Sequence, residues 1–507
     1  MSLLPWTIYL SFGGALLSWF GGRRSPLLAR WIALASMAGT IAIGACAACQ
    51  FSPSSGPVSL VNARWLPFAD YALSVDGLSL TFVLLTGLAG IAAVLFSWET
   101  KKRPGDFFAL FLALVGGVYG VFLSADALLL FVFYEIAIVP KYFLVAVWGS
   151  TNREYGAMKL VLYSFAGSAL VMAGLLWAAR ETGTSFGMVE LVSAARHLPS
   201  GIQVPLFALV FTGFAVLAGM FPFHTWAPTG HVAAPTGASM LLAGVVMKLG
   251  AYGCLRVALP AFPEGFAMFQ PAIAVLAIVG ILYAGLVALV QSDFKFVIGY
   301  SSVSHMGFVL LGLAAATTQA VSGAVLQMFS HGVVAGLLFA VVGRMVYERT
   351  HTRDLRQLRR MALARRMPFV AVVFVLAALA SMGMPGFSGF PAELAILAGT
   401  WQRSQVWALL AVLGIPVAAA FTLRAVQQAF FGKSAGVGGD GKGAVDSLGG
   451  LAGEHPFAPI TLPEKLGAVL LLGVSIVIGI RPDLLLDWIA PALESPLLKI
   501  AIQGVAQ

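Results

Sequence analysis

Apolar stretches of about 20 residues recur along this chain from Leu3 to Trp488, separated by short polar breaks. As an α-helix, a stretch of this length is long enough to cross the hydrocarbon core of a membrane, which is about 30 Å thick. Only 10% of the 507 residues are charged, whereas soluble domains are roughly a quarter charged. The sequence therefore predicts an all-α membrane protein with many spans.

Counting these stretches predicts about fourteen transmembrane helices. Their approximate ranges are 3–20, 28–50, 77–98, 106–124, 126–149, 158–179, 203–226, 235–258, 269–290, 296–317, 321–345, 368–400, 405–431 and 464–488. The first stretch has the length of a signal peptide, but two glycines and two arginines follow it at 21–24 instead of a small-residue cleavage site. We therefore interpret it as a retained span.

Lysine and arginine concentrate in every second loop. The loops after odd-numbered spans carry residues such as Arg23, Lys101, Arg153 and Lys295, whereas the loops after even-numbered spans carry few basic residues. Because basic loops stay in the cytoplasm, this alternation predicts that both termini lie on the periplasmic side. Topology accounts for the net charge of +9, so nucleic-acid binding is not expected.

Two segments between spans have distinctive compositions. Residues 351–366 are rich in arginine, and they either lie on the anionic inner leaflet or form a solvated loop. Residues 432–463 are polar and rich in glycine. This composition favours a flexible cytoplasmic loop over a second domain.

Helix breakers occur near the middle of two predicted spans. The first break, FPFHTWAP at 221–228, falls in span 7, and the second, MGMPGFSGFP at 382–391, falls in span 12. Lipid cannot satisfy the backbone groups that such breaks expose. Either neighbouring helices fill ordinary proline kinks, or the breaks mark an ion pathway between two repeats. The separation of five spans fits a repeat of five helices, so we favour the pathway.

Ionisable residues inside a span cost about 2.5–3.5 kcal/mol each on insertion scales, so they usually pair or mark a transport path. Glu135 lies near the centre of span 5, and Lys141 follows Pro140 in the same span. Six residues correspond to about 9 Å of rise and about 240° of rotation. A direct pair would therefore require Pro140 to distort the helix or the lysine side chain to bend back.

Four further titratable residues lie in later spans. Lys248 is in the middle of span 8, where two flanking glycines would let another helix approach closely. His305 and His331 follow, and Glu393 comes just after the break in span 12. Hydration and neighbouring charge change the proton affinity of a buried lysine, and histidine accepts or releases protons near neutral pH. Such groups on separate spans fit a proton relay driven from outside the chain. The alternative is that they only hold helices together.

The cysteines Cys46, Cys49 and Cys254 lie in apolar stretches, where a disulfide framework has no place. The first two have a metal-binding spacing, but a structural metal needs about four ligands. The sequence contains no phosphate-binding glycine loop, haem-attachment motif or cysteine set for an iron–sulfur cluster. We therefore expect no metal and no cofactor in this chain.

Several motifs between about residues 70 and 432 form a specific set. They are FYE at 133–135 with VPKYFL at 139–144, PFHTW at 222–226 with HVAAPT at 231–236, KLGAYG at 248–253, QSDFK at 291–295 with YSSVSHMG at 300–307, HG at 331–332, YER at 347–349, and GMPG at 383–386 followed by Glu393. This set resembles the M subunit of bacterial NADH:quinone oxidoreductase, respiratory complex I.

The resemblance implies an antiporter-like subunit of the membrane arm, with fourteen helices and two inverted five-helix repeats broken in spans 7 and 12. Glu135, Lys248 and Glu393 match the relay glutamate of span 5, lysine of span 8 and glutamate of span 12 in that family. The remaining relay candidates are His224, His231, His305, His331 and Lys141. The resemblance also implies that NADH, flavin, iron–sulfur clusters and quinone bind to partner subunits.

One relay position departs from the family pattern. Leu217 stands where the family has its span-7 lysine, seven residues before His224, and Gly219 stands where it has a proline. We hypothesise that Lys141, where the family commonly has an apolar residue, supplies the missing positive charge to Glu135. A neighbouring subunit is the alternative source of that charge.

The spans and the resemblance together predict five parts of the chain. They are an N-terminal three-helix segment at 1–105, a first repeat at 106–258, a second repeat at 269–431, the flexible loop at 432–463, and a C-terminal helix with its tail at 464–507.

The function expected from these features is proton translocation in the membrane arm of complex I, in the lipid bilayer of a bacterial inner membrane. The expected partners are other membrane-arm subunits, including further antiporter-like subunits. Three alternatives stay open: a cation/proton antiporter subunit, a membrane subunit of a related hydrogenase complex, or a divergent paralogue with altered pumping. A purely structural subunit of the arm is also compatible with the sequence.

Overall fold

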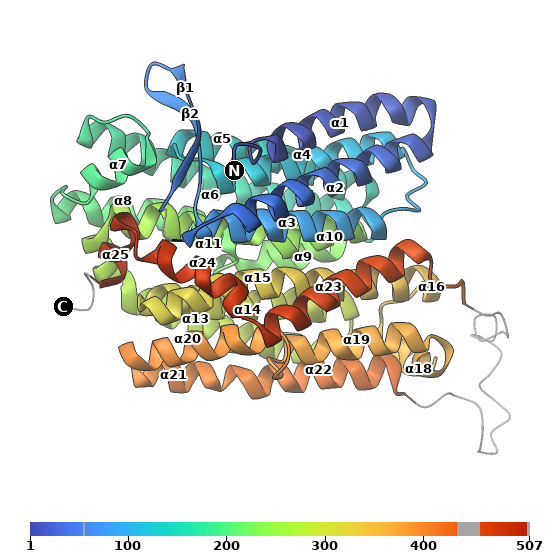
Figure 1. Cartoon of the computed structure of the whole chain (residues 1–507). Helices are drawn as coiled ribbons and strands as arrows, with labels where there is room; N and C mark the ends of the chain where they lie inside the picture. The colour runs from blue at the N-terminus through green and yellow to red at the C-terminus, as the bar shows by residue number, and fades with distance from the viewer. Residues whose placement is uncertain (54–55, 433–456, 504–507) are drawn as a thin grey trace, which may run out of the picture.

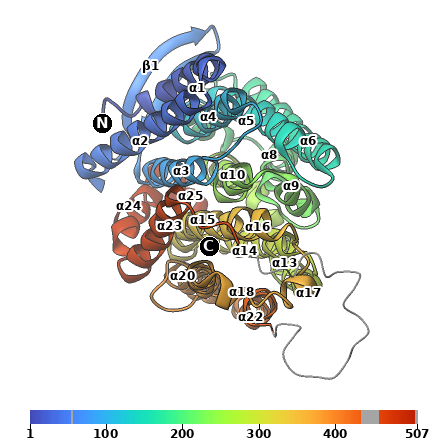
Figure 2. The same ribbon diagram turned by 90° about the vertical axis from the view of Figure 1, so that its right-hand side faces the viewer.

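The computed structural model of the chain describes residues 1–53, 56–432 and 457–503. Long helices lie side by side, seen along their length in Figure 1 and nearly end-on in Figure 2. Twelve helical segments among the described residues are long and apolar enough to cross a membrane. The prediction of a helical membrane protein with many spans is therefore confirmed.

The twelve segments follow one another along the chain. They are α2 (Pro26–Gln50), α3 (Gly77–Phe96), α4 (Pro104–Leu123), α5 (Ala127–Trp148), α6 (Arg153–Thr182), α8 to α9 (Ser200–Ala233), α10 to α12 (Thr236–Ala261), α13 (Pro263–Val290), α14 (Phe294–Ala315), α15 to α16 (Thr318–Thr350), α21 to α22 (Gln405–Phe430) and α23 (Leu462–Ile480). Shorter helices are α7 (Met188–Ala195), α17 (Leu355–Leu358), α18 (Leu363–Arg366), α24 (Asp483–Leu493) and α25 (Pro496–Gln503).

Three of the predicted spans differ from this set of twelve. The helix α1 (Trp6–Arg24) covers the first predicted span, but it is not among the twelve apolar segments. The range 368–400 forms two helices, α19 (Pro368–Ser381) and α20 (Gly389–Arg403). The last predicted span ends at Ile480 instead of 488, because Arg481 and Pro482 separate α23 from α24.

The all-α prediction was incomplete, since the chain also contains a β-hairpin. Strands β1 (Val58–Leu66) and β2 (Ala69–Val75) pair in antiparallel fashion between α2 and α3. The backbone N–H of Asp70 donates to the Asp126 carboxylate at 3.2 Å, which ties β2 to the start of α5. The pattern of long apolar stretches does not reveal the hairpin, because its strands are only nine and seven residues long.

Polar side chains at the starts of spans fix where these helices begin. Asp76 accepts a hydrogen bond from the backbone N–H of Ser79 at 2.9 Å and caps α3. Asp126 and Asp293 cap α5 and α14 in the same way. Such side chains satisfy N–H groups that have no partner inside the helix, which stabilises a helix end by about 1 kcal/mol.

Both predicted breaks interrupt helical structure. The helix α8 (Ser200–Ala218) ends before Gly219, and the chain resumes as a short 3₁₀ turn (Phe223–Thr225) and α9 (Trp226–Ala233). The second break separates α19 from α20, and Gly383 and Gly386 adopt φ values of 69° and 93° there. Glycine adopts these left-handed conformations without the steric cost that a Cβ imposes.

Three π-helical turns, which were not predicted, lie within the spans in the described part of the chain. They are Leu242–Val246 between α10 (Thr236–Leu241) and α11 (Met247–Gly253), Cys254–Ala258 after α11, and Val341–Tyr347 after α15 (Thr318–Ala340). Such turns often occur at functional sites in helices. The first one ends two residues before Lys248, and its Ala243 carbonyl accepts a hydrogen bond from the Nζ of this lysine.

The basic loops also differ in part from the prediction. Lys295 was assigned to a loop, but it lies in the first turn of α14 and is only 3% exposed. Within the arginine-rich segment, Asp354 forms an isolated β-bridge with Asp293. Residues 433–456, most of the predicted flexible loop, lie outside the residues that the structure describes.

Candidate functional site

Lys248 lies at the centre of the bundle, on α11, and is completely buried. Its Nζ donates to the carbonyl of Ala243 in the preceding π-helical turn and lies 2.6 Å from Nδ1 of His331 on α15. A protonated lysine can only donate, so His331 Nδ1 accepts when Lys248 is charged. The two side chains form a direct contact over which a proton can pass.

Two glycines bring the helices of Lys248 and His331 together. A Cβ on Gly244 would lie 3.0 Å from the carbonyl oxygen of Gly332, and a Cβ on Gly332 would lie 2.6 Å from that of Gly244. Any larger residue at 332 would therefore push the two backbones apart. The sequence reading expected that glycines near Lys248 would allow a close helix approach, and the structure identifies Gly332 on α15 as the partner.

The chain of titratable groups continues from His331 to His305 on α14. The two imidazole rings stack with centroids 5.4 Å apart. His305 Nδ1 lies 2.7 Å from the carbonyl of Ser301, and Nε2 lies 2.9 Å from the carbonyl of Ser381. A neutral imidazole has a single N–H. Only a doubly protonated His305 can therefore donate to both carbonyls, which suits a site that receives a proton.

Glu393 on α20 completes the chain. Its Oε1 lies 3.8 Å from His305 Nε2 and accepts a hydrogen bond from Gln327 at 3.1 Å. A Cβ at Gly383 would lie 2.6 Å from Oε2 of Glu393. The glycine in the second helix break therefore leaves room for the carboxylate.

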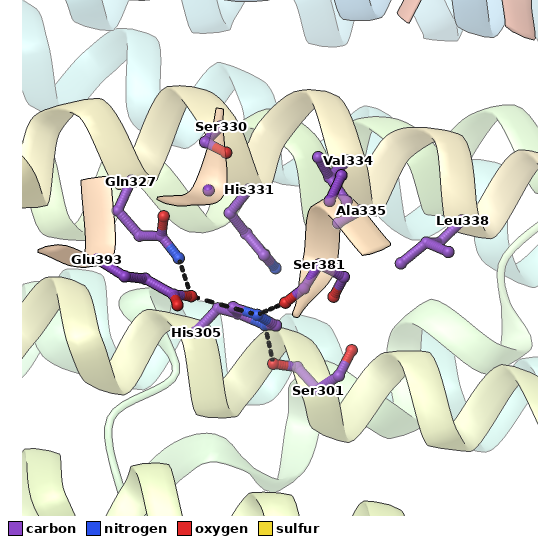
Figure 3. Close-up of a pocket in the computed structure, with 12 residues that line it drawn as sticks. Ser301, His305, Gln327, Ser330, His331, Val334, Ala335, Leu338, Ser381 and Glu393 are labelled. Atoms are coloured by element: carbon purple, nitrogen blue, oxygen red, sulfur yellow. Dashed lines mark hydrogen bonds and ion pairs between the residues drawn. The ribbon is translucent and has the colours of Figure 1, made fainter. Parts of the chain in front are cut away.

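These groups surround a small cavity, shown in Figure 3, where Glu393 and His305 point toward each other below His331. The space accessible to the centre of a water molecule is about 10 Å³, about the minimum that one water requires. Three serines, Ser301, Ser330 and Ser381, are among the residues that line it. The lining can therefore hydrogen-bond a water between the titratable groups.

Glu135 and Lys141 on α5 form no ion pair within 4 Å in the described part of the chain. Lys141 is 1% exposed, and its Nζ donates to the hydroxyl of Ser164 on α6 at 2.9 Å. One turn further along α6, the Ser168 hydroxyl donates to the Phe165 carbonyl at 3.2 Å and lies near Glu135, on which the charge of Lys141 also acts. The side chains of Glu135 and Lys141 thus lie beside the same part of α6, which contains Ser164 and Ser168, without contacting each other directly.

The histidines of the first break lie apart from the chain that ends at Glu393. His224 contacts the rings of Phe221, Tyr283 and Tyr300, and neither of its ring nitrogens has a hydrogen-bond partner among the described residues. His231 is completely buried, with Nε2 3.3 Å from the sulfur of Met247, the neighbour of Lys248 in sequence. His231 is therefore much closer to the central lysine than His224 is.

Leu217, at the position of the family lysine, packs in the core of the bundle. It is 1% exposed, and its backbone, with that of Phe214 and Ala218, lies within 3.0 Å of the position that a Cβ on Gly250 would occupy. The helices α8 and α11 are thus in close contact here. The apolar residue lets this contact form without a buried charge on α8.

Sequence reasoning missed two buried ion-pair clusters near the ends of the bundle. Asp76 pairs with Arg256, which also donates to the Tyr252 hydroxyl at 3.1 Å. Burial alone would raise the pKa of Asp76, but the Arg256 charge and hydrogen bonds from Ser79 hold it below its usual range. No sequence signal joins these residues, because Asp76 precedes α3 and Arg256 lies in another span.

The second cluster joins the end of the long segment α15 to α16 with α23. Glu464 is 1% exposed and accepts from Arg344 at 2.6 Å and from Arg349 at 2.7 Å. Arg344 also pairs with Glu99 and Glu348. The sequence placed Arg349 in a basic loop, whereas the structure uses it to hold the start of α23.

The fold and the buried chain of acidic and basic groups define a multi-span membrane protein of the antiporter type. Residues 124–418 match the family described as NADH:quinone oxidoreductase/Mrp antiporter, transmembrane. The chain belongs to this family. Among the described residues, no group of three or more His, Cys, Asp or Glu side chains is placed to hold a metal ion.

Individual relatives agree with this assignment. The chain is 35% identical to "NADH-quinone oxidoreductase subunit M" of Rhodobacter capsulatus, over 92% of this chain and 89% of the relative. A chain of respiratory complex I from Thermus thermophilus superposes with a TM-score of 0.84 at 28% identity, covering 96% of this chain and 99% of that one. A chain of the Mrp complex from Dietzia sp. has the same TM-score at 21% identity, over 100% and 99%, and shares the fold.

Proposed function

We propose that this chain is the proton-translocating M-type subunit in the membrane arm of a complex I-type NADH:quinone oxidoreductase. The observation that carries the proposal is the buried series of contacts from Lys248 through His331 and His305 to Glu393. The relative named subunit M and the fold shared with respiratory complex I support the same role.

The chemistry assigned to this chain is proton transfer alone. A proton on Lys248 moves to His331 Nδ1, the imidazole releases a proton from its other nitrogen toward His305, and Glu393 accepts it next. Each step covers a hydrogen bond or one bridging water. NADH, flavin, iron–sulfur clusters and quinone belong to partner subunits, so the driving force arrives through contacts with those subunits.

The finer architecture follows from the same proposal. Counting α1 and the broken pair α19 and α20 as spans raises the twelve apolar segments to fourteen. We assign 106–258 and 269–431 to two inverted five-helix repeats, broken in spans 7 and 12. Residues 1–105 form the preceding three-helix segment, 432–463 a flexible cytoplasmic loop, and 464–507 the C-terminal helix and tail.

The orientation in a bacterial inner membrane follows from charge. Lysine and arginine concentrate in loops at one end of the bundle, here called the basic side, which includes Lys101, Arg153 and residues 351–366. The positive-inside rule places the basic side in the cytoplasm and both termini in the periplasm.

Lys141 takes over the role of the absent span-7 lysine in this proposal. It is buried, and its charge acts on Glu135 across Ser164 and Ser168. The serine hydroxyls can relay a proton between the two groups, since each hydroxyl both donates and accepts. Glu135, Lys141 and His224 then belong to the part of the relay in the first repeat.

A cation/proton antiporter subunit is the second candidate, because the Mrp complex chain has the same fold. The two candidates differ in their partners. An affinity tag on this chain, used to purify its complex from membranes, should co-purify NADH-binding and iron–sulfur subunits, and the complex should acidify vesicles on addition of NADH and quinone. Recovery of antiporter subunits alone, with sodium-driven proton movement and no response to NADH, would contradict the proposal.

A further inference from the structure

We infer that Lys295 and His231 form a branch of the relay that delivers protons to Lys248 from the basic side. This inference rests on the proposed proton-translocating function. It adds Lys295, which the sequence placed in a loop, and it gives His231 a specific position in the order of transfer.

Lys295 is an ammonium group buried at the boundary between the first helix break and the basic side. Its Nζ lies 2.9 Å from the carbonyl oxygen of Ala234 and 3.4 Å from both the Val232 carbonyl and the Ser239 hydroxyl. Only 3% of the residue is exposed. Burying a lysine is costly, and within the described residues no carboxylate approaches this one to within 4 Å.

The Asp293–Arg353 pair connects Lys295 to the surface. Arg353 Nε lies 3.3 Å from Asp293 Oδ2, and their side chains are 10% and 29% exposed. Arg353 Nη1 also donates to the Val232 carbonyl at 3.2 Å, the same oxygen that Lys295 approaches. The partly exposed carboxylate therefore lies at the water-facing surface, two residues before the buried lysine in sequence.

His231 is close to the residues that surround both lysines, since its Nε2 lies 3.3 Å from the sulfur of Met247, the neighbour of Lys248 in sequence. The charges of both Lys295 and Lys248 act on its ring, and the ring in turn acts on His331. The Ser239 hydroxyl ties the His231 backbone to the surroundings of Lys295, since it donates to the His231 backbone carbonyl at 2.7 Å and lies 3.4 Å from Lys295 Nζ. His231 Nδ1 is buried without a hydrogen-bond partner among the described residues. Buried polar atoms normally have such a partner.

The proton balance of the branch is simple. Lys295 releases a proton through a bridging water to one nitrogen of His231, and the imidazole releases a proton from its other nitrogen toward Lys248. Lys295 then regains a proton from the basic side. No charge or atom is left over, and Lys248 is ready to pass its proton to His331.

A purely structural role for Lys295 makes a different prediction. Val232 and Ala234 are at the C-terminal end of α9, where a positive charge stabilises the unpaired carbonyls. If Lys295 only caps this end, an arginine or a glutamine that donates to the same carbonyls should replace it. If Lys295 must release its proton, neither can, because arginine holds its proton and glutamine has none to release.

The experiment compares Lys295→Arg, Lys295→Gln and His231→Gln in the purified whole complex in proteoliposomes. The initial rate of NADH-driven proton uptake is divided by the rate of NADH oxidation with a water-soluble electron acceptor, which reports the amount of assembled complex. Lys102→Gln is the matched control, because Lys102 also donates to a carbonyl at a helix end, that of Val147 at 3.0 Å, but is exposed.

The branch predicts that all three variants lower the normalised rate about a hundredfold or more, the lower end of the range for loss of a positioned proton carrier. The control should leave the rate unchanged. A normal rate in Lys295→Arg or Lys295→Gln would overturn the role of Lys295. If the Lys295 variants assemble poorly, His231→Gln decides, and a normal rate there overturns the branch. Lys248→Ala in the same assay separates failure of the branch from failure of the proposed function. If this variant also pumps normally, the proposed function itself fails.

Discussion

Gly332 offers a sharp test of whether the Lys248–His331 contact matters, because neither side chain needs to be altered. A Cβ at position 332 would lie 2.6 Å from the Gly244 carbonyl oxygen, whereas ordinary contacts begin at 3.4 Å. In Gly332→Ala the two helices must therefore separate by about 0.8 Å, the difference between these two distances. If the same displacement applies to the neighbouring side chains, the Lys248–His331 distance grows from 2.6 Å to about 3.4 Å, beyond the usual limit of about 3.2 Å for such a hydrogen bond.

The matched control lies one turn further along the same helix. A Cβ at Gly336 would meet only a Leu471 methyl at 3.8 Å, so Gly336→Ala has room and gains helix propensity of about 1 kcal/mol. We expect Gly332→Ala to lower NADH-driven proton uptake in proteoliposomes several-fold, with a stability cost of about 1–3 kcal/mol typical of overpacking. Gly336→Ala should pump as the wild type does. Wild-type pumping by an assembled Gly332→Ala complex would refute the importance of this contact.

Two further outcomes follow from the buried charges. Lys141→Leu leaves Glu135 without its nearby positive charge and should reduce proton uptake about tenfold. Adding Leu217→Lys to the same chain should restore part of the uptake. If Lys141→Leu causes no loss, or if Leu217→Lys restores nothing, Lys141 does not take the role of the span-7 lysine. Asp76→Asn leaves Arg256 buried without its partner and should lower the free energy of unfolding by about 3 kcal/mol, measured by thermal unfolding in detergent. The control Asp483→Asn, in the exposed Arg481 pair, should leave the free energy of unfolding unchanged, because water already solvates both charges. Because its pKa is lowered on folding, Asp76 stabilises the protein above the unfolded pKa of about 4, and this contribution disappears as the pH falls through the folded value.

The sequence predicted those features that depend on local composition. Long apolar stretches identify spans because the membrane requires them, and proline with glycine identifies the two helix breaks because both residues oppose a continuous helix. Lys248, His305, His331 and Glu393 stood out because titratable groups are rare in spans. Their mutual distances could not be predicted, since these depend on which helices pack together.

The missed features are those that depend on contacts between distant segments. From the sequence, Lys295 is predicted to be a loop residue near Asp293. It is buried only because residues 232–239 pack over it in the folded chain. The π-helical turn before Lys248 has no sequence signal of its own, and the partner of Gly244 is 88 residues away at Gly332. The β-hairpin was missed because its strands are far shorter than a span.

The central claim is that protons pass through Lys248, and the number of protons translocated per NADH oxidised tests it most directly. This ratio is measured in proteoliposomes by recording internal pH and NADH absorbance together, in the wild type and in Lys248→Ala. We expect Lys248→Ala to assemble and to show a lower ratio, or to lose coupled quinone reduction together with pumping. An unchanged ratio at an unchanged rate of quinone reduction would contradict the account.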